Sequence, residues 1–344
     1  IQRLGKVEDG TTTSDYDQLE IERHIGINLS LLPLEWQETK VNLIDTPGYA
    51  DFVSEVKSGL RVAEGAIIVV CAASGVEIGT EQMWLEVEKL HLPCLILINK
   101  MDRDNADFYN ILDEIQRKLG GKCLPVQLPI GSQNDFQGIV DLVTMKGYSG
   151  SPRKEIDVPS ALGEKATSFR ERLIEAAVEV DDELITKYLE GETISDEEIF
   201  RAIKQATVSG DLVPVFAGSA LRCVGAEPLL DAICLYLASP QEKNTIVAMD
   251  LNRNKEEIKS SVESPFTSLV FKTTADPYVG KLSYFRVYSG VVSSNSQVWN
   301  TNKGGMERIG QLFTMLGKNQ QPAPQLAAGD IGAVARLGLS VVGD

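Results

Sequence analysis

The feature that most constrains the fold is an alternation, between Lys40 and Asn99, of short apolar runs with amphipathic stretches. Continuous apolar runs bounded by helical patterns are typical of strands that are buried on both faces. In chain order, the segments are residues 41–44, 52–63, 66–71, 81–90 and 94–98. This order predicts a βαβαβ unit, and therefore an α/β domain with a largely parallel sheet covered by helices on both faces.

Polar motifs follow three of the predicted strands directly. Ligands of such sheets bind beyond the carboxyl ends of the strands, so these positions are where chemistry is expected. The motifs are Asp45-Thr46-Pro47-Gly48, Asn99-Lys100-Met101-Asp102 and, after the apolar run 213–216, Gly218-Ser219-Ala220-Leu221. One such motif alone is a weak signal. All of them, in this order and at strand ends, predict one nucleotide site.

The second and third motifs suit the recognition of guanine. Guanine presents two adjacent donors, N1–H and its exocyclic amine, and the carboxylate of Asp102 can accept from both. Asn99 can bind the base edge and connect neighbouring loops, Lys100 can lay its alkyl stem across the base or ribose, and the Ala220 N–H can reach the guanine carbonyl. Adenine would leave the carboxylate unpaired, which disfavours it. The alternative is a Lys-Asp surface turn with no ligand.

The first motif suits a metal-bound phosphate. Asp45 can hold Mg²⁺ through water, because Mg²⁺ keeps much of its hydration shell in proteins. The Gly48 N–H can approach a γ-phosphate closely because no Cβ intervenes. The alternative is that Pro47 and Gly48 only form a turn ahead of a helix.

Segment patterns divide the chain further. We assign residues 1–119 and 211–240 to a nucleotide-binding domain and residues 120–210 to an inserted α/β subdomain, with a strand near 138–143 and helices near 169–178 and 196–207. Residues 241–263 are polar and are predicted to be a linker. From residue 264 to 344 the apolar period changes to two, which predicts a small antiparallel β-barrel.

Composition limits the partners. With 33 Lys and Arg against 49 Asp and Glu the net charge is −16, so non-specific attraction to DNA is disfavoured, and an RNA partner would need a local basic patch. Apolar runs long enough to span a bilayer are absent from the sequence. We therefore expect a cytoplasmic, monomeric protein that neither binds DNA nor enters a membrane.

Together these motifs resemble those of elongation factor G, a family of translational GTPases. The resemblance extends over essentially the whole chain and includes segments beyond the three motifs: Asp9-Gly10-Thr11, Glu22 to Ile27, Arg103, Ala275 to Leu282 and Arg286 to Gly290. It implies a G domain of the P-loop NTPase type with an insertion, followed by a β-barrel. It also implies GTP or GDP with Mg²⁺ as ligands, ribosomal RNA and ribosomal proteins as partners, and ribosome-dependent GTP hydrolysis.

The sequence departs from the family pattern at three places. A G-x-x-x-x-G-K-[ST] phosphate-binding loop is missing from these 344 residues, so by themselves they are expected to be inactive and to bind nucleotide weakly. We interpret this as truncation. Tyr49 stands where the family has its catalytic histidine, and Gly26 where it has a Mg²⁺-ligating threonine. These two changes resemble a paralogous group of elongation factor G-like proteins.

Two hypotheses on function follow. The first is a GTPase whose hydrolysis is coupled to translocation or to a related ribosomal step. The second, favoured by Tyr49 and Gly26, is a ribosome-binding factor that responds to nucleotide but hydrolyses it poorly. A histidine at position 49 would orient the attacking water, whereas a tyrosine offers only a hydrogen bond. Alternatively, Tyr49 packs its ring beneath the following helix, next to Phe52, and takes no part in the chemistry.

Overall fold

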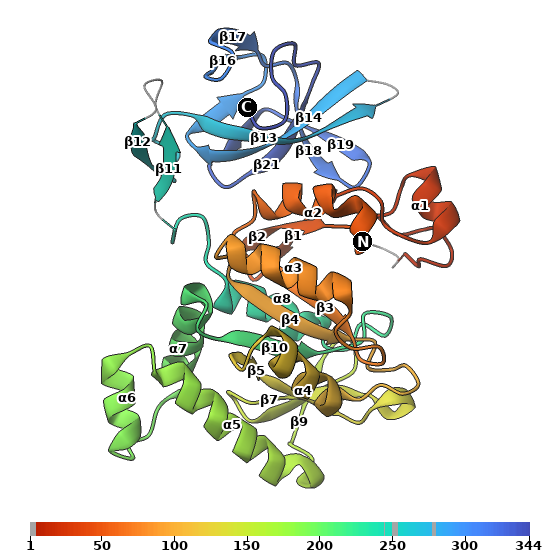
Figure 1. The fold of residues 1–344 in the computed structure, drawn as a ribbon, viewed down its shortest axis with the longest axis vertical. Coiled ribbons are helices and arrows are strands. Elements are labelled where there is room, and N and C mark those ends of the chain that lie inside the picture. The colour runs from red at the N-terminus through yellow and green to blue at the C-terminus, as the bar shows by residue number, and fades with distance from the viewer. Residues whose placement is uncertain (1–4, 244, 250–253, 277–279) are drawn as a thin grey trace. The chain divides into compact units, whose positions relative to one another are not determined.

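The structure is a computed structural model that describes residues 5–243, 245–249, 254–276 and 280–344, and it contains two compact units (Figure 1). One unit is Glu64–Ala238. The other combines Ile1–Ala63 with Ser239–Asp344. The predicted nucleotide-binding domain, residues 1–119 and 211–240, thus contributes to both units.

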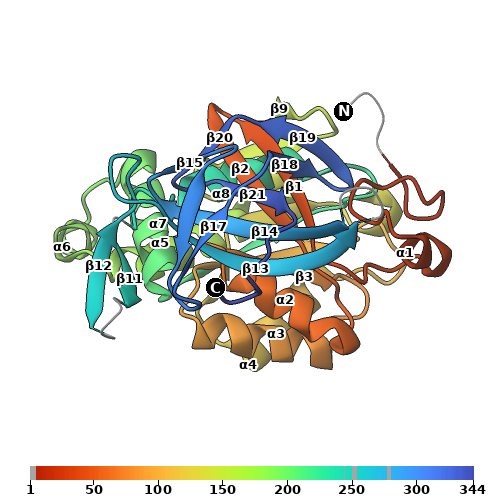
Figure 2. The ribbon, with the colours of Figure 1, turned by 90° about the horizontal axis from the view of Figure 1, so that it is seen from above.

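The Glu64–Ala238 unit is built on a parallel sheet, as the apolar runs predicted, and its strand order is β3-β4-β10-β5. Helix α3 packs on β3, α4 on β5 and α7 (Asp196–Ser209) on β10. In Figure 2, α3 and α4 lie at the bottom of the view, and α7 and α8 lie above them. The elements are β3 (Ala66–Cys71), α3 (Ile78–Lys89), β4 (Cys94–Asn99), α4 (Phe108–Leu119), β5 (Cys123–Pro125), β10 (Val213–Ala217) and α8 (Ala226–Tyr236).

Burial explains why these segments adopt their structures. In β4, Leu95, Ile96 and Ile98 have no exposed surface, as expected of a central strand with both faces covered. Helix α4 begins where the Asp107 carboxylate accepts a hydrogen bond from the Asn110 N–H at 3.1 Å, which caps the free amide groups of the first turn. The order and burial of these elements place the carboxyl ends of β4 and β10 side by side.

The insertion is an antiparallel sheet, in the order β6-β7-β8-β9, followed by helices. Its elements are β6 (Gln127–Ile130), η2 (Gln133–Asp135), β7 (Gly138–Asp141), β8 (Lys146–Ser149), β9 (Lys154–Ile156), η3 (Ser160–Leu162), α5 (Gly163–Val178), α6 (Asp182–Leu189) and α7 (Asp196–Ser209). β7, α5 and α7 confirm the strand and the two helices predicted for this region. Helix α6 and the other strands of this sheet were not predicted.

The second unit contains the antiparallel β-barrel, whose main sheet has the order β13-β14-β21-β18-β19. The strands are β13 (Thr267–Asp276), β14 (Gly280–Ser289), β15 (Val291–Ser293), β16 (Gln297–Asn300), β17 (Gly305–Arg308), β18 (Leu312–Leu316), β19 (Asn319–Ala323), β20 (Gln325–Ala327) and β21 (Ile331–Ala335). Phe285, Val287, Leu312 and Val334 lie in its core. Pro277, Tyr278 and Val279, part of the resembling segment, lie outside the described residues.

The amino-terminal part of this unit holds α1 (Gln18–Arg23), β1 (Ser30–Trp36), β2 (Thr39–Asp45), η1 (Ala50–Phe52) and α2 (Val53–Leu60). The strand predicted at residues 41–44 is confirmed, but it pairs antiparallel with β1 and not with a parallel neighbour. Gln37 and Glu38 form the tight turn with φ of 45° and 61°. Asn or Gly usually occupies such positions, and the sequence has neither here, so it did not predict this turn.

A second apolar cluster joins the amino-terminal segment to the barrel. Leu29, Leu31 and Val62 pack with Phe271 and Leu282 of β13 and β14, whose side chains on this side face away from the barrel core. The two strands are thus apolar on both faces. This packing explains why residues 1–63 form one unit with the barrel.

The predicted linker, residues 241–263, contains a hairpin of β11 (Thr245–Met249) and β12 (Lys255–Lys259). Ile246, Ala248 and Ile258 are half-buried in this hairpin. Most residues around them are polar and exposed, so the alternation of apolar and polar residues was too weak to predict the two strands. Within the described residues, none of the helices is both long and apolar enough to cross a membrane.

Candidate functional site

The loop after β4 is organised by the side chain of Asn99. Its Oδ1 accepts hydrogen bonds from the Lys100 N–H at 2.8 Å and from the Ala220 N–H at 2.9 Å. Lys100 has a left-handed φ of 63°, which turns the chain sharply and leaves its side chain exposed. One side-chain oxygen therefore connects the two motifs that were predicted to read guanine.

Backbone contacts fix the same two loops against each other. The Gly218 N–H donates to the Ile98 carbonyl at 3.0 Å, and the Met101 N–H donates to the Gly218 carbonyl at 3.2 Å. The Met101 side chain is fully buried and anchors its loop in the core. Since β4 and β10 are parallel neighbours, their carboxyl ends place both motifs at one edge of the sheet.

Asp102 presents a buried acceptor without a protein partner. Its side chain is 10% exposed, and its Oδ1 is buried with no hydrogen bond. Its Oδ2 lies 3.9 Å from Nε of Arg222. A buried carboxylate oxygen without a donor is costly, so the geometry fits a ligand that supplies donors here. Guanine, with its two adjacent donors, is such a ligand.

The Ser219-Ala220-Leu221 segment forms a closed turn. Ser219 is buried and exchanges backbone hydrogen bonds with Val224 at 2.9 and 3.1 Å, while its Oγ accepts from the Arg222 N–H at 3.2 Å. Leu221 is 71% exposed. The Ala220 N–H, predicted to reach the guanine carbonyl, donates to Asn99 in this structure, so a base contact would have to share or replace that bond.

The Asp45-Thr46-Pro47-Gly48 motif lies in the other unit, directly after β2. Although part of Asp45 is exposed, desolvation of its carboxyl by the surrounding protein raises the pKa of that group; Asp15 and Glu20 raise it further, and a Ser14 hydrogen bond partly offsets the rise. Gly48 is exposed, and no atom lies within 4 Å of where a Cβ would stand.

Asp45 offers a carboxylate oxygen to a divalent cation, although the described residues contain no cluster of three or more side chains that could hold one. The raised pKa means that burial and neighbouring negative charge disfavour the ionised carboxylate, and a bound cation would reverse that effect. Mg²⁺ takes oxygen ligands, usually with several waters. Asp45 would hold the ion through water, and the ion would supply positive charge to the phosphates.

The two departures from the family pattern lie in the same unit as Asp45. Tyr49 precedes η1 and is 57% exposed, so more than half of its surface is open to solvent. Gly26 is half-buried, and a Cβ there would lie 3.4 Å from Asp15 Oδ1 and 3.9 Å from the Pro47 Cα. A side chain at position 26 would thus point toward the Asp45 motif.

Sequence reasoning missed two residues that organise the site. Glu20 is buried, and its carboxylate accepts from the Asp17, Ile27 and Asn28 N–H groups at 2.8–2.9 Å, which orders the segment around Gly26. Its signal was the capping box that Asp17 and Glu20 form at the start of α1. Arg222 carried only a weak signal, its position directly after Leu221.

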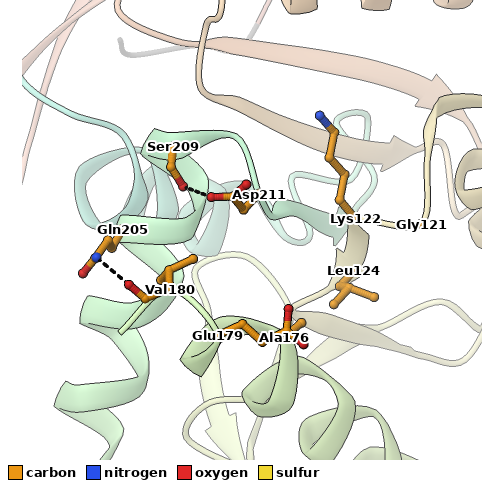
Figure 3. Close-up of a pocket in the computed structure, with 9 residues that line it drawn as sticks. All are labelled: Gly121, Lys122, Leu124, Ala176, Glu179, Val180, Gln205, Ser209 and Asp211. Atoms are coloured by element: carbon orange, nitrogen blue, oxygen red, sulfur yellow. Dashed lines mark hydrogen bonds between the residues drawn. The ribbon is translucent and has the colours of Figure 1, made fainter. Parts of the chain in front are cut away.

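A separate surface cavity of about 720 Å³ lies elsewhere in the Glu64–Ala238 unit (Figure 3). It is lined by residues of the segment after α4 and of the carboxyl ends of α5 and α7. The predicted site residues are not among them. In Figure 3 the polar groups of Gln205 and Ser209 are engaged with Val180 and Asp211.

A parallel α/β sheet with paired NKxD-type and Ser-Ala loops at its carboxyl edge defines a guanine nucleotide-binding domain. Residues 1–239 match the family described as the elongation factor Tu GTP binding domain, and residues 265–344 match elongation factor G domain 2. The chain belongs to the elongation factor G family of translational GTPases.

Among solved structures, the chain is similar to a protein from Thermus thermophilus whose crystal structure is described only by the designation ttk003000868. The two are 32% identical in sequence with a TM-score of 0.85. The match covers 98% of this chain and 48% of that one, so the chain spans about half the length of its relative.

Proposed function

We propose that this chain binds GTP and GDP as part of a translational GTPase, with Asn99, Lys100 and Asp102 reading the base together with Ser219, Ala220 and Leu221. The observation that carries this proposal is the buried, unpartnered Oδ1 of Asp102, beside two loops connected through Asn99. Asp45 to Gly48 would serve the phosphate and Mg²⁺.

In the whole protein, nucleotide binding would serve GTP hydrolysis stimulated by the ribosome and coupled to translocation or a related step. Family membership supports this role. The partners would be ribosomal RNA and ribosomal proteins. Because the net charge is −16, contact with RNA requires local basic surfaces. We propose a cytoplasmic monomer.

The base-reading role is tested by Asp102→Asn in the full-length protein. An amide replaces one acceptor with a donor, so it matches the carbonyl that xanthine carries in place of the guanine amine. We expect GDP affinity to fall by about 5- to 150-fold and XDP affinity to rise, as measured by calorimetry, since a mismatched buried polar pair costs about 1–3 kcal/mol.

Asp104→Asn is the matched control, since Asp104 is exposed two residues farther along the same loop. It should leave both affinities unchanged. Unaltered GDP binding in Asp102→Asn would show that Asp102 is not the base reader. ADP binding as tight as GDP binding in the unmodified protein would refute the guanine site itself.

A second candidate function is a ribosome-binding factor that hydrolyses GTP poorly. Gly26 and the exposed Tyr49 favour it, because neither supplies the group that the resemblance assigns to its position. Single-turnover hydrolysis by the full-length protein with ribosomes separates the two candidates. Rapid ribosome-stimulated turnover would support the GTPase, and nucleotide-dependent ribosome binding without turnover would support the alternative.

A further inference from the structure

We propose that Arg222 is a positioning residue for guanine selectivity. Its positive charge balances the buried negative charge of Asp102 and leaves both carboxylate oxygens free to accept hydrogen bonds from a ligand. The proposal rests on the guanine site proposed above. Arg222 lies outside the Ser219-Ala220-Leu221 motif, and it acts on the base through Asp102.

The distance between the two charges is the first part of the argument. Arg222 Nε lies 3.9 Å from Asp102 Oδ2, close enough for ionic attraction but too far for a hydrogen bond. A carboxylate buried without a counter-charge is strongly disfavoured. At this distance Arg222 supplies the counter-charge while both oxygens of Asp102 stay available for two donors of a ligand.

The guanidinium is held in place by the insertion. Arg222 Nη1 donates to the carbonyls of Asn134 at 3.2 Å and Phe136 at 3.3 Å. These contacts direct the donors of Nη1 to the loop between β6 and β7, with Nε on the side of Asp102. Although the Arg222 side chain is 37% exposed, its end is thus fixed to backbone groups. A lysine ammonium lacks this planar fork and could not make the same set of contacts.

The loop that holds Arg222 is itself tied to the base-reading loop. The Gln133 N–H donates to the Met101 carbonyl at 2.8 Å, one residue before Asp102. Gly131 begins this loop with a φ of 76°, and a Cβ there would lie 2.0 Å from the Asp135 carbonyl oxygen, so only glycine allows the turn. The insertion, Arg222 and Asp102 therefore form a closed set of contacts.

Two roles of Arg222 can be separated by experiment, and we expect the first of them, that of counter-charge, to dominate. As a counter-charge, it matters only while residue 102 is a carboxylate. As a tether of the loop at residues 131–137, it matters whatever residue stands at position 102. Xanthine nucleotides and Asp102→Asn separate these effects, because the amide keeps the shape of the carboxylate but needs no counter-charge.

The experiment compares Arg222→Gln in two backgrounds of the full-length protein by calorimetry. With Asp102 present, we expect GDP affinity to fall by about tenfold or more, as for truncation of one member of a partly buried charge pair. With Asp102→Asn present, we expect the added Arg222→Gln to change XDP affinity by less than about twofold. Arg222→Lys should lose less GDP affinity than Arg222→Gln, since it keeps the charge.

Arg201→Gln is the matched control, because Arg201 is an exposed arginine of α7, 4.0 Å from Asp181, and should leave GDP affinity unchanged. Equal losses of GDP and XDP affinity would reduce Arg222 to a structural tether and overturn the proposal. So would an Arg222→Gln variant that binds GDP normally, and in that case the guanine site would still stand. An unmodified protein that fails to bind GDP would overturn both.

Discussion

At the level of single residues, we propose that Tyr49 limits the rate of hydrolysis in the full-length protein. A histidine at this position can orient the attacking water and, when protonated, stabilise negative charge in the transition state. A tyrosine is neutral at pH 7, since its ordinary pKa is about 10, and offers only a hydrogen bond. Because Tyr49 is 57% exposed, replacing its side chain should cost little packing.

We therefore expect Tyr49→His to raise ribosome-stimulated turnover of the full-length protein, by up to about 10²-fold, the usual contribution of one such electrostatic contact. The substitution should be measured with and without Gly26→Thr, because the missing threonine could limit the metal site first. A Cβ at position 26 is sterically acceptable, since it meets Asp15 and Pro47 only at ordinary contact distances.

Tyr188→His makes the same change at an exposed tyrosine of α6, outside the site, and is the matched control. If Tyr49→His left turnover unchanged in both backgrounds, the water would be positioned by a different group. The rate of GTP hydrolysis would then not depend on the side chain at position 49.

At the scale of an element, helix α2 packs closely against β2 and against the motif that follows it. Gly59 faces β2, where a Cβ would lie 3.1 Å from Leu29 Cδ1, 3.2 Å from Thr46 Cγ2 and 3.3 Å from Ile44 Cγ2. These distances are too short for ordinary contact, so the neighbours would have to move. One of them, Thr46, belongs to the motif that follows β2.

Two opposing terms decide the effect of Gly59→Ala. Alanine stabilises a helix over glycine by about 1 kcal/mol, whereas overpacking typically costs about 1–3 kcal/mol. We expect a net loss of about 1 kcal/mol in the free energy of unfolding, measured by urea denaturation. Weaker nucleotide binding should accompany it because Thr46 is displaced.

Gly163→Ala is the matched control, since Gly163 begins α5 and has no atom within 4 Å of the Cβ position. Only the helix-propensity term acts there, so the variant should be as stable as the unmodified protein or slightly more stable. A stabilising Gly59→Ala would mean that α2 is not packed this closely against β2.

Elements with strong apolar patterns could be predicted from the sequence, and weakly patterned ones could not. Strands β4 and β10 are largely apolar because both of their faces are covered in the sheet, whereas β3 is apolar although it lies at the sheet edge and leaves Val69 55% exposed. The β1–β2 turn uses Gln37 and Glu38 in left-handed conformations, for which neither residue type is a signal. The β11–β12 hairpin is polar, and its apolar periodicity is too weak to distinguish it from a linker.

At the scale of the whole molecule, the motifs predicted which residues gather after β4 and β10, but not what holds them. The Arg222 side chain is held by hydrogen bonds to the backbone carbonyls of Asn134 and Phe136, which lie more than eighty residues away in the sequence. The association of residues 1–63 with the barrel likewise depends on contacts of Leu29 and Leu31 with β13 and β14. Such long-range pairings are not encoded in any local pattern.

Lys272 of β13 connects the barrel to the amino-terminal part of the same unit. This lysine is 5% exposed, and its ammonium donates to the Leu29 carbonyl at 3.1 Å and forms an ion pair with Glu55 of α2. Glu55 also accepts from the Leu29 N–H at 2.7 Å. Lys272 thus joins the barrel both to α2 and to the chain that leads from Gly26 into β1.

We expect Lys272→Met to destabilise this unit by about 2 kcal/mol, somewhat below the 3–5 kcal/mol typical of breaking a fully buried pair, because the Glu55 side chain is 26% exposed. Adding Glu55→Gln should recover part of the loss, since the amide still accepts from Leu29 but carries no unpaired charge. Lys318→Met makes the same change at an exposed barrel position and should alter stability by less than about 0.5 kcal/mol. Urea denaturation of the full-length variants tests all three. If Lys272→Met and Lys318→Met were equally mild, or if Glu55→Gln deepened the loss, the Lys272 ion pair would not be what joins the barrel to α2.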